Sequence, residues 1–223
     1  MTTSGCDASL RSRLSPKLVV FDFDGTLADS FPWFAGVIND VARRWGFKTI
    51  AVGEEAVLRY MGASDIFRHL QVPNWKVPMI AADLRRRMSR EIDRIALFDG
   101  IARELTRLDA AGLRLGIASS NAEINIRQVL GPTLWDLMRQ RECGIGISAK
   151  HDRLKRLLRR ARVGPDQAIY IGDEVRDIDA ARRAGTAVGA VTWGYNDASV
   201  LRRCDPDLLF AHVHEISARL LPR

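Results

Sequence analysis

The stretch FDFDGTL, residues 21–27, directly follows an apolar run that begins at Leu18. Short apolar runs that stop at polar residues are typical of strands buried on both faces of a parallel sheet. Ligands bind such sheets just beyond the carboxyl ends of the strands. Asp22 and Asp24 lie there, and their spacing of two lets both face one ligand across Phe23. The stretch therefore predicts an α/β fold with an acidic site at a strand end.

Further apolar runs predict the rest of the sheet, and a weaker strand is expected near residues 143–148, where glycines lower the strand propensity. Helical periodicity fills intervals between the runs, at residues 101–111, 152–162 and 177–184. Strands that alternate with helices predict a doubly wound parallel sheet of the Rossmann-like type. The predicted strands are residues 18–23, 113–118, 168–171 and 187–192, with a possible edge strand at 208–210.

The interval between the first two strands breaks this alternation. It contains helical patterns at residues 34–45, 54–60 and 79–96 and no strong strand pattern. We predict an inserted helical cap at residues 30–97 and an α/β core at 17–29 and 98–223. Residues 1–16 are polar, lack the apolar core of a secretory signal, and are expected to form a disordered tail.

Polar side chains follow the other predicted strands as well. Because the carboxyl ends of parallel strands share one edge of the sheet, we expect these groups to converge on one pocket. Mg²⁺ prefers carboxylate, carbonyl and water oxygens, and it would relieve the repulsion between neighbouring aspartates. A hydroxyl, backbone N–H groups and a lysine would stabilise a transferring phosphoryl group. The candidates beyond the first strand are Ser119, Ser120, Asn121, Lys150, Asp173, Glu174 and Asp177.

Each candidate also has a plainer interpretation. Asp22, Ser119 and Asp173 could cap turns or helices, since these residue types favour such positions. Their joint occurrence with a lysine at successive strand ends favours an active site. Lys155 is the alternative to Lys150, although it lies within the predicted helix.

The motif set resembles the haloacid dehalogenase superfamily. DFDGT at residues 22–26 is similar to its first motif, and GDEVRD at residues 172–177 is similar to its fourth. A serine and a lysine lie between them in the expected order. A helical insertion separates the first two motifs, as in the family. The resemblance covers residue 17 to the C-terminus. The fit is least good at the third motif, because Lys150 is followed by His151 rather than by the frequent small residue or proline.

The resemblance implies a role for each site residue. Asp22 would be the nucleophile and Asp24 the general acid and base, while Mg²⁺ would be held by both residues, Asp24 through its backbone carbonyl, and by Asp173. Supporting roles would fall to Glu174, a possible metal neighbour, and to Asp177, which would orient the metal shell. Phosphate-binding positions would be Gly25, Thr26, Ser119, Ser120, Asn121 and Lys150.

A phosphatase is favoured over a dehalogenase or a phosphonate-cleaving enzyme, because Asp24 supplies the acid that phosphate esters require. The cap and the segment TWGY at residues 192–195 look most like phosphoglycolate phosphatases. A sugar-phosphate or nucleotide phosphatase, a phosphomutase, and an inactive binding or regulatory protein stay open as alternatives. In the cap, Gly62 is a candidate pivot, and Arg68 or His69 could meet the substrate. Trp193 would line the pocket or brace the cap.

Composition limits the kinds of binding partner and the compartment that we expect. The 34 Lys and Arg residues exceed the 27 Asp and Glu residues, which favours an anionic partner, but most of them fall on predicted helix faces and no nucleic-acid motif accompanies them. The three cysteines form no close pair, which fits a reducing compartment. No apolar run is long enough to span a bilayer. We expect a cytoplasmic enzyme with a small phosphate ester as partner; the sequence does not decide between a monomer and a homodimer.

Overall fold

The computed structural model describes residues 16–51, 53–61, 63–144 and 150–222. The predicted tail falls almost entirely outside these ranges, and Gly62 lies outside them as well. Six parallel strands form one sheet in the order β3-β2-β1-β4-β5-β6. The strands are β1 (Leu18–Phe21), β2 (Arg114–Ala118), β3 (Met138–Glu142), β4 (Ala168–Gly172), β5 (Ala187–Val191) and β6 (Leu208–Phe210). The predicted doubly wound parallel sheet is confirmed.

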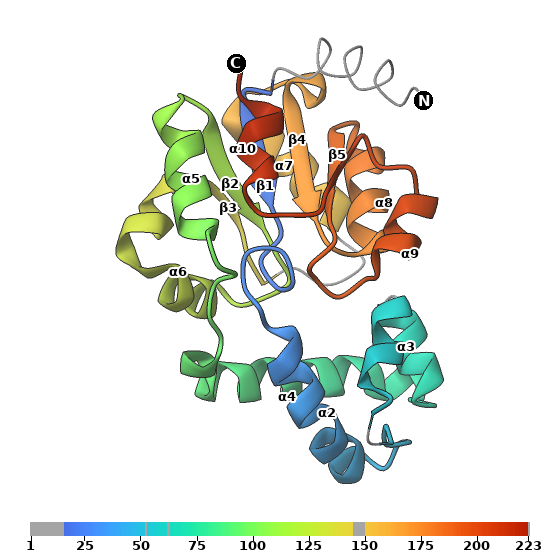
Figure 1. Ribbon diagram of the computed structural model, residues 1–223. Helices are drawn as coiled ribbons and strands as arrows, with labels where there is room; N and C mark the ends of the chain where they lie inside the picture. Colours follow the sequence, from blue (N-terminus) through green and yellow to red (C-terminus); the bar gives the residue numbers. More distant parts are fainter. Residues whose placement is uncertain (1–15, 52, 62, 145–149, 223) are drawn as a thin grey trace.

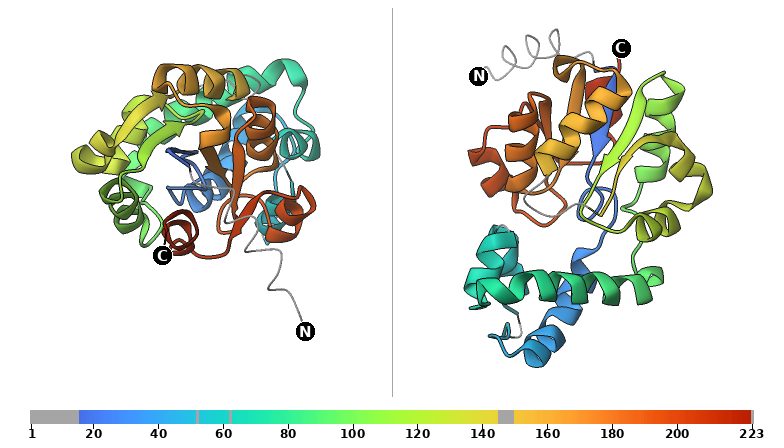
Figure 2. Two further views of the ribbon diagram at one scale, coloured as in Figure 1. Left: turned by 90° about the horizontal axis from the view of Figure 1, so that it is seen from above. Right: turned by 180° about the vertical axis from the view of Figure 1, so that it is seen from behind.

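Helices cover both faces of the sheet (Figures 1 and 2). Alternate residues of β1 point to opposite faces: Val19 and Phe21 pack in one apolar cluster, and Leu18 and Val20 in the other. Burial of both faces explains why β1 is apolar throughout. The first cluster lies under α5 (Ile101–Ala110), α6 (Glu123–Leu137) and α10 (Glu215–Leu220), and the second under α7 (Lys150–Ala161), α8 (Val175–Ala184) and α9 (Ala198–Arg203).

A helical insertion, residues 31–94, lies below the carboxyl ends of the strands in Figure 1. Its chain enters and leaves through paired linkers, where the N–H of Asp29 donates to Ala96 at 2.9 Å and the N–H of Phe98 donates to Leu27 at 2.9 Å. Its helices enclose a separate apolar cluster that includes Ile38, and the assignment of residues 30–97 to a domain of their own stays a prediction. The elements are α2 (Phe31–Trp45), η1 (Glu55–Tyr60), α3 (Ala63–His69), η2 (Asn74–Lys76), α4 (Val77–Arg90) and η3 (Ile92–Arg94).

The weaker strand was predicted in the wrong place. The structure has β3 at Met138–Glu142; residues 143 and 144 follow it as loop, and 145–148 lie outside the described ranges. β3 is an edge strand whose middle residues are polar, so it lacks the continuous apolar run of a central strand. The guanidinium of Arg141 stacks on Trp135, 4.1 Å from the ring centroid. Helix α6 was not predicted, because Gly131 interrupts it with a φ of 68°.

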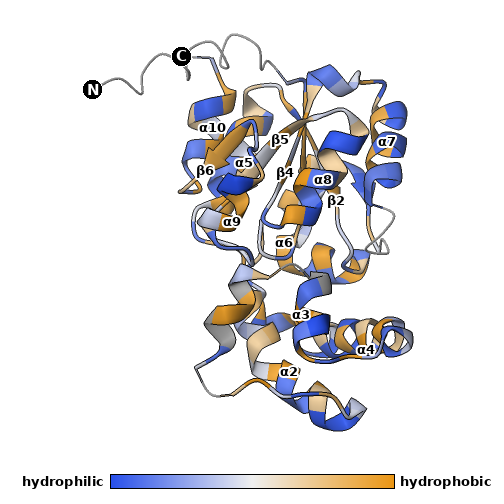
Figure 3. Cartoon of the chain, turned by 90° about the vertical axis from the view of Figure 1, so that its right-hand side faces the viewer, coloured by the Kyte–Doolittle hydropathy of each residue, from blue (hydrophilic) through white to orange (hydrophobic). Residues whose placement is uncertain are grey.

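Hydropathy follows these layers (Figure 3): α7 is mainly hydrophilic on its outer side, while its leucines face the sheet. Among the described residues, no helix is long and apolar enough to cross a membrane. Glu142 at the end of β3 is buried, and its carboxylate accepts hydrogen bonds from Arg153 at 3.1 Å and Arg160 at 2.9 Å. Its backbone carbonyl also accepts the N–H of Ser119 at 3.0 Å, which joins β3 to the loop after β2.

We expect Glu142→Gln to lower the free energy of unfolding by about 1–2 kcal/mol, because the buried oxygens lose charge-assisted hydrogen bonds to two arginines. Chemical denaturation followed by circular dichroism measures the change. The control is Asp40→Asn, which removes an exposed ion pair with Arg43 and should change stability by less than about 0.5 kcal/mol. Equal small effects in both variants would contradict the structural role of Glu142.

Candidate active site

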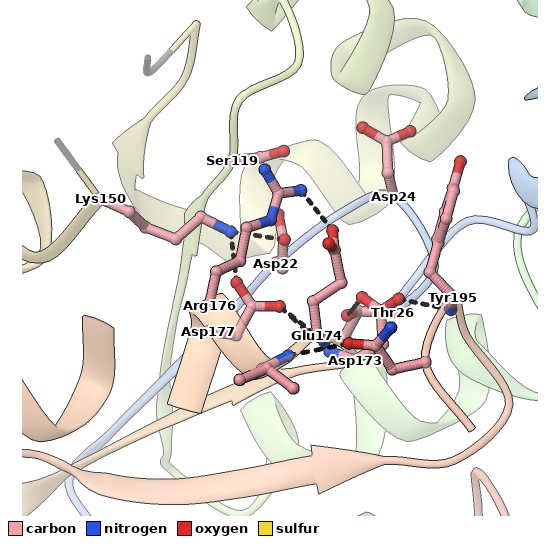
Figure 4. Close-up of polar contacts among 12 residues, drawn as sticks. Asp22, Asp24, Thr26, Ser119, Lys150, Asp173, Glu174, Arg176, Asp177 and Tyr195 are labelled. Atoms are coloured by element: carbon pink, nitrogen blue, oxygen red, sulfur yellow. Dashed lines mark hydrogen bonds and ion pairs between the residues drawn. The ribbon is translucent and has the colours of Figure 1, made fainter. Parts of the chain in front are cut away.

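The carboxyl ends of β1 and β4 bring the predicted acidic residues together (Figure 4). β1 ends at Phe21, and the N–H of Asp22 still donates to Ile171 of β4 at 2.9 Å. Residues 22–28 then turn sharply, with Gly25 at a φ of 74°. The Asp22 carboxylate, 2% exposed as a residue, accepts the N–H of Phe23 at 2.7 Å. Its position is therefore set by the backbone on both sides.

Lys150 links two of these acids. Its Nζ lies 2.6 Å from Asp22 Oδ2 and 2.6 Å from Asp177 Oδ1. Burial opposes the charge on the lysine, but the carboxylates of Asp177 and Asp22 outweigh it and raise the pKa of Lys150. Lys150 thus remains an ammonium group that touches the candidate nucleophile; Lys155, the alternative, lies one turn further along α7.

Asp173 is held from two loops. Its Oδ1 accepts the hydroxyl of Thr26 at 2.8 Å, and its Oδ2 accepts the N–H of Tyr195 at 2.7 Å. Burial and the charges of Glu174, Asp177 and Asp22 raise the pKa of Asp173 well above its usual range. So many carboxylates without a neutralising cation make ionisation of Asp173 unfavourable.

The donor set fits a divalent cation. Asp22, Asp173 and Asp177 each offer one carboxylate oxygen, and these oxygens lie within 4.8 Å of one another. Hard divalent cations bind such carboxylates and would favour the ionised form of Asp173. Asp177 already accepts Lys150 and the N–H groups of Asp173 and Glu174, at 3.2 and 3.1 Å, so it is better suited to orient the site than to bind the ion.

Asp24 differs from Asp22 in its surroundings. Burial, and after it the charge of Asp22, raises the pKa of Asp24 to about 6, although hydrogen bonds from Ser30 and Asn121 oppose the shift. The Asn121 side-chain amide donates to the two carboxylate oxygens at 3.2 and 3.0 Å and also approaches Met88 of α4 at 3.0 Å. A carboxyl group with this pKa can both give and take a proton near neutral pH.

The loop after β2 carries the predicted hydroxyls. Ser119 is fully buried, and its Oγ accepts the N–H of Asn121 at 3.2 Å, which leaves its own proton free to donate. Ser120 lines the cavity beside Asp24. The Thr26 hydroxyl donates to Asp173 at 2.8 Å, and the phosphate-binding role of Thr26 stays a prediction.

A cavity opens between the core and the helical insertion next to Asp24. Two arginines, Arg85 and Arg176, line it, and neither was predicted as a site residue. Arg68 is exposed, pairs with Asp65 at 2.7 Å and, like His69, is not part of the lining. Most of the other lining side chains are apolar: Trp33, Phe34, Met61, Ile66, Phe67, Ala81, Leu84, Met88 and Tyr195.

Two residues of the 192–195 segment connect the site to the linkers. Trp193 donates its Nε1–H to the carbonyl of Thr26 at 3.1 Å and packs edge-on against Phe98, so it braces the first-motif loop. The Tyr195 hydroxyl lies 3.0 Å from Ser30 Oγ, and its ring meets Phe31 at 5.2 Å. Tyr195 therefore connects the carboxylate of Asp173 to the entry of the helical insertion.

Comparison with known proteins agrees with this geometry. The family model of haloacid dehalogenase-like hydrolases matches residues 19–191. The chain belongs to this family. The resemblance drawn from the motifs is thereby confirmed.

Individual relatives extend the comparison of this hydrolase. It is 35% identical over 194 residues to a phosphoglycolate phosphatase of Synechococcus elongatus, covering 86% of this chain and 92% of the relative. It is 30% identical over 192 residues to a phosphoglycolate phosphatase of Xanthomonas campestris, with 81% and 85% covered. A haloacid dehalogenase-like hydrolase from Streptococcus pneumoniae shares the fold, with a TM-score of 0.78 at 20% identity over 93% of this chain and 99% of that one.

Gly194 packs so tightly that we expect Gly194→Ala to displace Asp173. An added Cβ would lie 2.3 Å from Asp173 Cβ and 2.3 Å from the carbonyl oxygen of Gly25, and backbone atoms cannot yield as a flexible side chain can. Calorimetry should show divalent-cation affinity reduced by at least roughly tenfold, the loss of about one good charged contact. The control is Gly36→Ala in α2, where nothing lies within 4 Å. Unchanged cation affinity in Gly194→Ala would contradict the packing argument.

Proposed function

We propose that this hydrolase is a phosphatase that cleaves a small phosphomonoester through a phosphoaspartate on Asp22. The observation that carries the proposal is the buried Asp22 carboxylate in contact with the Lys150 ammonium, with Asp24 two residues away at a pKa of about 6. One carboxylate is paired with a cation, and the second carboxyl can hold a proton. If these aspartates only capped turns, Asp22 and Asp24 would not need such different surroundings.

The reaction takes two displacements at phosphorus. An Asp22 oxygen forms a bond to phosphorus while the ester P–O bond breaks, and Asp24 gives its proton to the leaving oxygen. Asp24, now ionised, takes a proton from a water that attacks phosphorus, which releases inorganic phosphate and restores Asp22. Lys150 and Ser119 bind the phosphoryl oxygens during both steps.

Mg²⁺, held by the carboxylates of Asp22 and Asp173 and the backbone carbonyl of Asp24, would offset the negative charge that collects on the phosphoryl oxygens. Asp177 and Glu174 orient this acidic set, and the backbone around Gly25 keeps the loop close to Asp173. The helical insertion acts as a cap that excludes water from the phosphoryl group before attack.

The proposed substrate is a phosphorylated carboxylic acid such as 2-phosphoglycolate, which is supported by the names of the two relatives. A second anionic group on the substrate needs a cation in the cap. Arg85 of α4 lines the cavity, is exposed, and makes no ion pair with the described part of the chain. We assign the substrate carboxylate to Arg85.

The first test is phosphate release from 2-phosphoglycolate, sugar phosphates and nucleotides, with and without Mg²⁺. Wild type should turn over 2-phosphoglycolate preferentially and only with the metal, and Asp22→Asn should lose more than about a thousandfold in rate, since it removes the nucleophile. Circular dichroism checks that the variant folds. Absence of turnover on every ester would favour a binding or regulatory protein, and recovery of an isomerised phosphate ester would indicate a mutase.

Arg85→Gln tests the substrate assignment. We expect it to raise KM for 2-phosphoglycolate roughly fivefold, the worth of a contact of about 1 kcal/mol, because the carboxylate loses its partner. KM for p-nitrophenyl phosphate, which has no carboxylate, should stay the same. The matched control is Arg86→Gln, because Arg86 is the next residue, approaches Asp83 at 3.7 Å and does not line the cavity. A parallel loss on both substrates would contradict a carboxylate-binding role.

A further inference from the structure

Arg176 is a partly buried cation that the motifs do not explain. It is the second residue of α8, its side chain is 25% exposed, and it lines the cavity beside Asp24. One terminal nitrogen contacts Glu174, while Nε is fully buried without a hydrogen-bond partner among the described residues. In the view of Figure 4 the guanidinium appears among the site residues, and its dashed contact runs to Glu174.

Helix stability does not account for this arginine. A positive charge in the first turn opposes the helix dipole, which favours acidic groups there. Glu174 and Asp177 already cap the same helix through reciprocal hydrogen bonds. A buried donor without an acceptor is also unfavourable. The position of Arg176 is costly for the fold alone, so a ligand is the better explanation.

The surrounding charges keep the guanidinium in place. Although burial opposes the charge, the carboxylates of Glu174, Asp177 and Asp22 hold the pKa of Arg176 above its usual value. Glu174 uses one terminal nitrogen of the planar group, and the side chain still lines the cavity beside Asp24. A guanidinium has five donors, and phosphoryl oxygens match its planar geometry.

We propose that the part-exposed guanidinium of Arg176 binds a non-bridging oxygen of the substrate phosphoryl group, together with Ser119 and Lys150. This assignment rests on the proposed phosphatase function. The phosphoryl group fits this place better than the far end of the substrate does, because Arg176 belongs to the core, where the charges of Glu174, Asp177 and Asp22 act on it, whereas Arg85 belongs to α4 of the insertion. Glu174 thereby acts as a positioning residue that aims Arg176.

Calorimetric binding of inorganic phosphate, the product, to the full chain in the presence of Mg²⁺ tests the contact without turnover. Arg176→Gln should weaken phosphate binding by roughly 10- to 100-fold, the usual worth of a charged hydrogen bond, and Arg176→Lys by less. Arg182→Gln, on the exposed side of the same helix, should bind phosphate like wild type. Phosphate affinity of folded Arg176→Gln within twofold of wild type would overturn the assignment.

A double variant separates ligand binding from charge balance. If Arg176 only neutralised Glu174, Glu174→Gln combined with Arg176→Gln would restore phosphate affinity, and that result would also overturn the proposal. We expect the double variant to bind as weakly as Arg176→Gln. Arg176-dependent phosphate binding without ester hydrolysis would sink the phosphatase function but keep this contact. Ester hydrolysis by the wild type together with unchanged phosphate affinity in Arg176→Gln would support the phosphatase function and overturn the assignment of Arg176.

Discussion

The buried ammonium of Lys150 is the interaction on which the site depends. Two aspartates from different parts of the chain meet it at 2.6 Å, one directly after β1 and the other in the first turn of α8. Without this cation, Asp22 and Asp177 would repel each other in surroundings of low dielectric, where an unpaired charge is very unfavourable. The ammonium thus joins the end of β1 to the first turn of α8. The remaining acids are arranged around this pair.

The same arrangement reaches into the helical insertion. Asp173 bonds to the backbone of Tyr195, whose hydroxyl and ring contact Ser30 and Phe31 at the start of α2. A second connection runs from Asp24 through the Asn121 amide to Met88 of α4. Movement of the insertion on its paired linkers would therefore change the hydrogen-bonded surroundings of both Asp173 and Asp24. A site with such connections can complete its geometry only when the insertion is in place.

The cavity between core and insertion is lined by two cations. Arg176 comes from the core, and Arg85 comes from the insertion. Most of the other lining side chains are apolar, so charged parts of a ligand are favoured near these two groups. Such a pocket suits a small molecule with two anionic groups, which the proposed substrate class has.

Local patterns in the sequence determined much of this protein. The apolar runs predicted four central strands, because burial on both faces demands apolar residues throughout. Acids, hydroxyls and a lysine after those strands predicted one convergent pocket, since parallel strands end at one edge of the sheet. The family assignment followed from the same motifs. The position of the polar edge strand β3 and the kinked helix α6 were not predicted, because the stacking of Arg141 on Trp135 and the turn at Gly131 produce no periodic pattern in the sequence.

Only the tertiary structure decided which side chains face the cavity. Arg68 and His69 end helix α3 without lining the cavity, which Ile66 and Phe67 of the same helix line instead. In the sequence Arg176 is a basic residue inside an acidic motif. Its buried Nε, which has no hydrogen-bond partner in the described part of the chain, is seen only once α8 is packed against β4 and β5. Periodicity reports whether a residue is buried, whereas the direction of a long charged side chain depends on partners far away in the chain. The sequence therefore determined the fold and the class of chemistry, and the packing of core against insertion decided which cations meet the ligand.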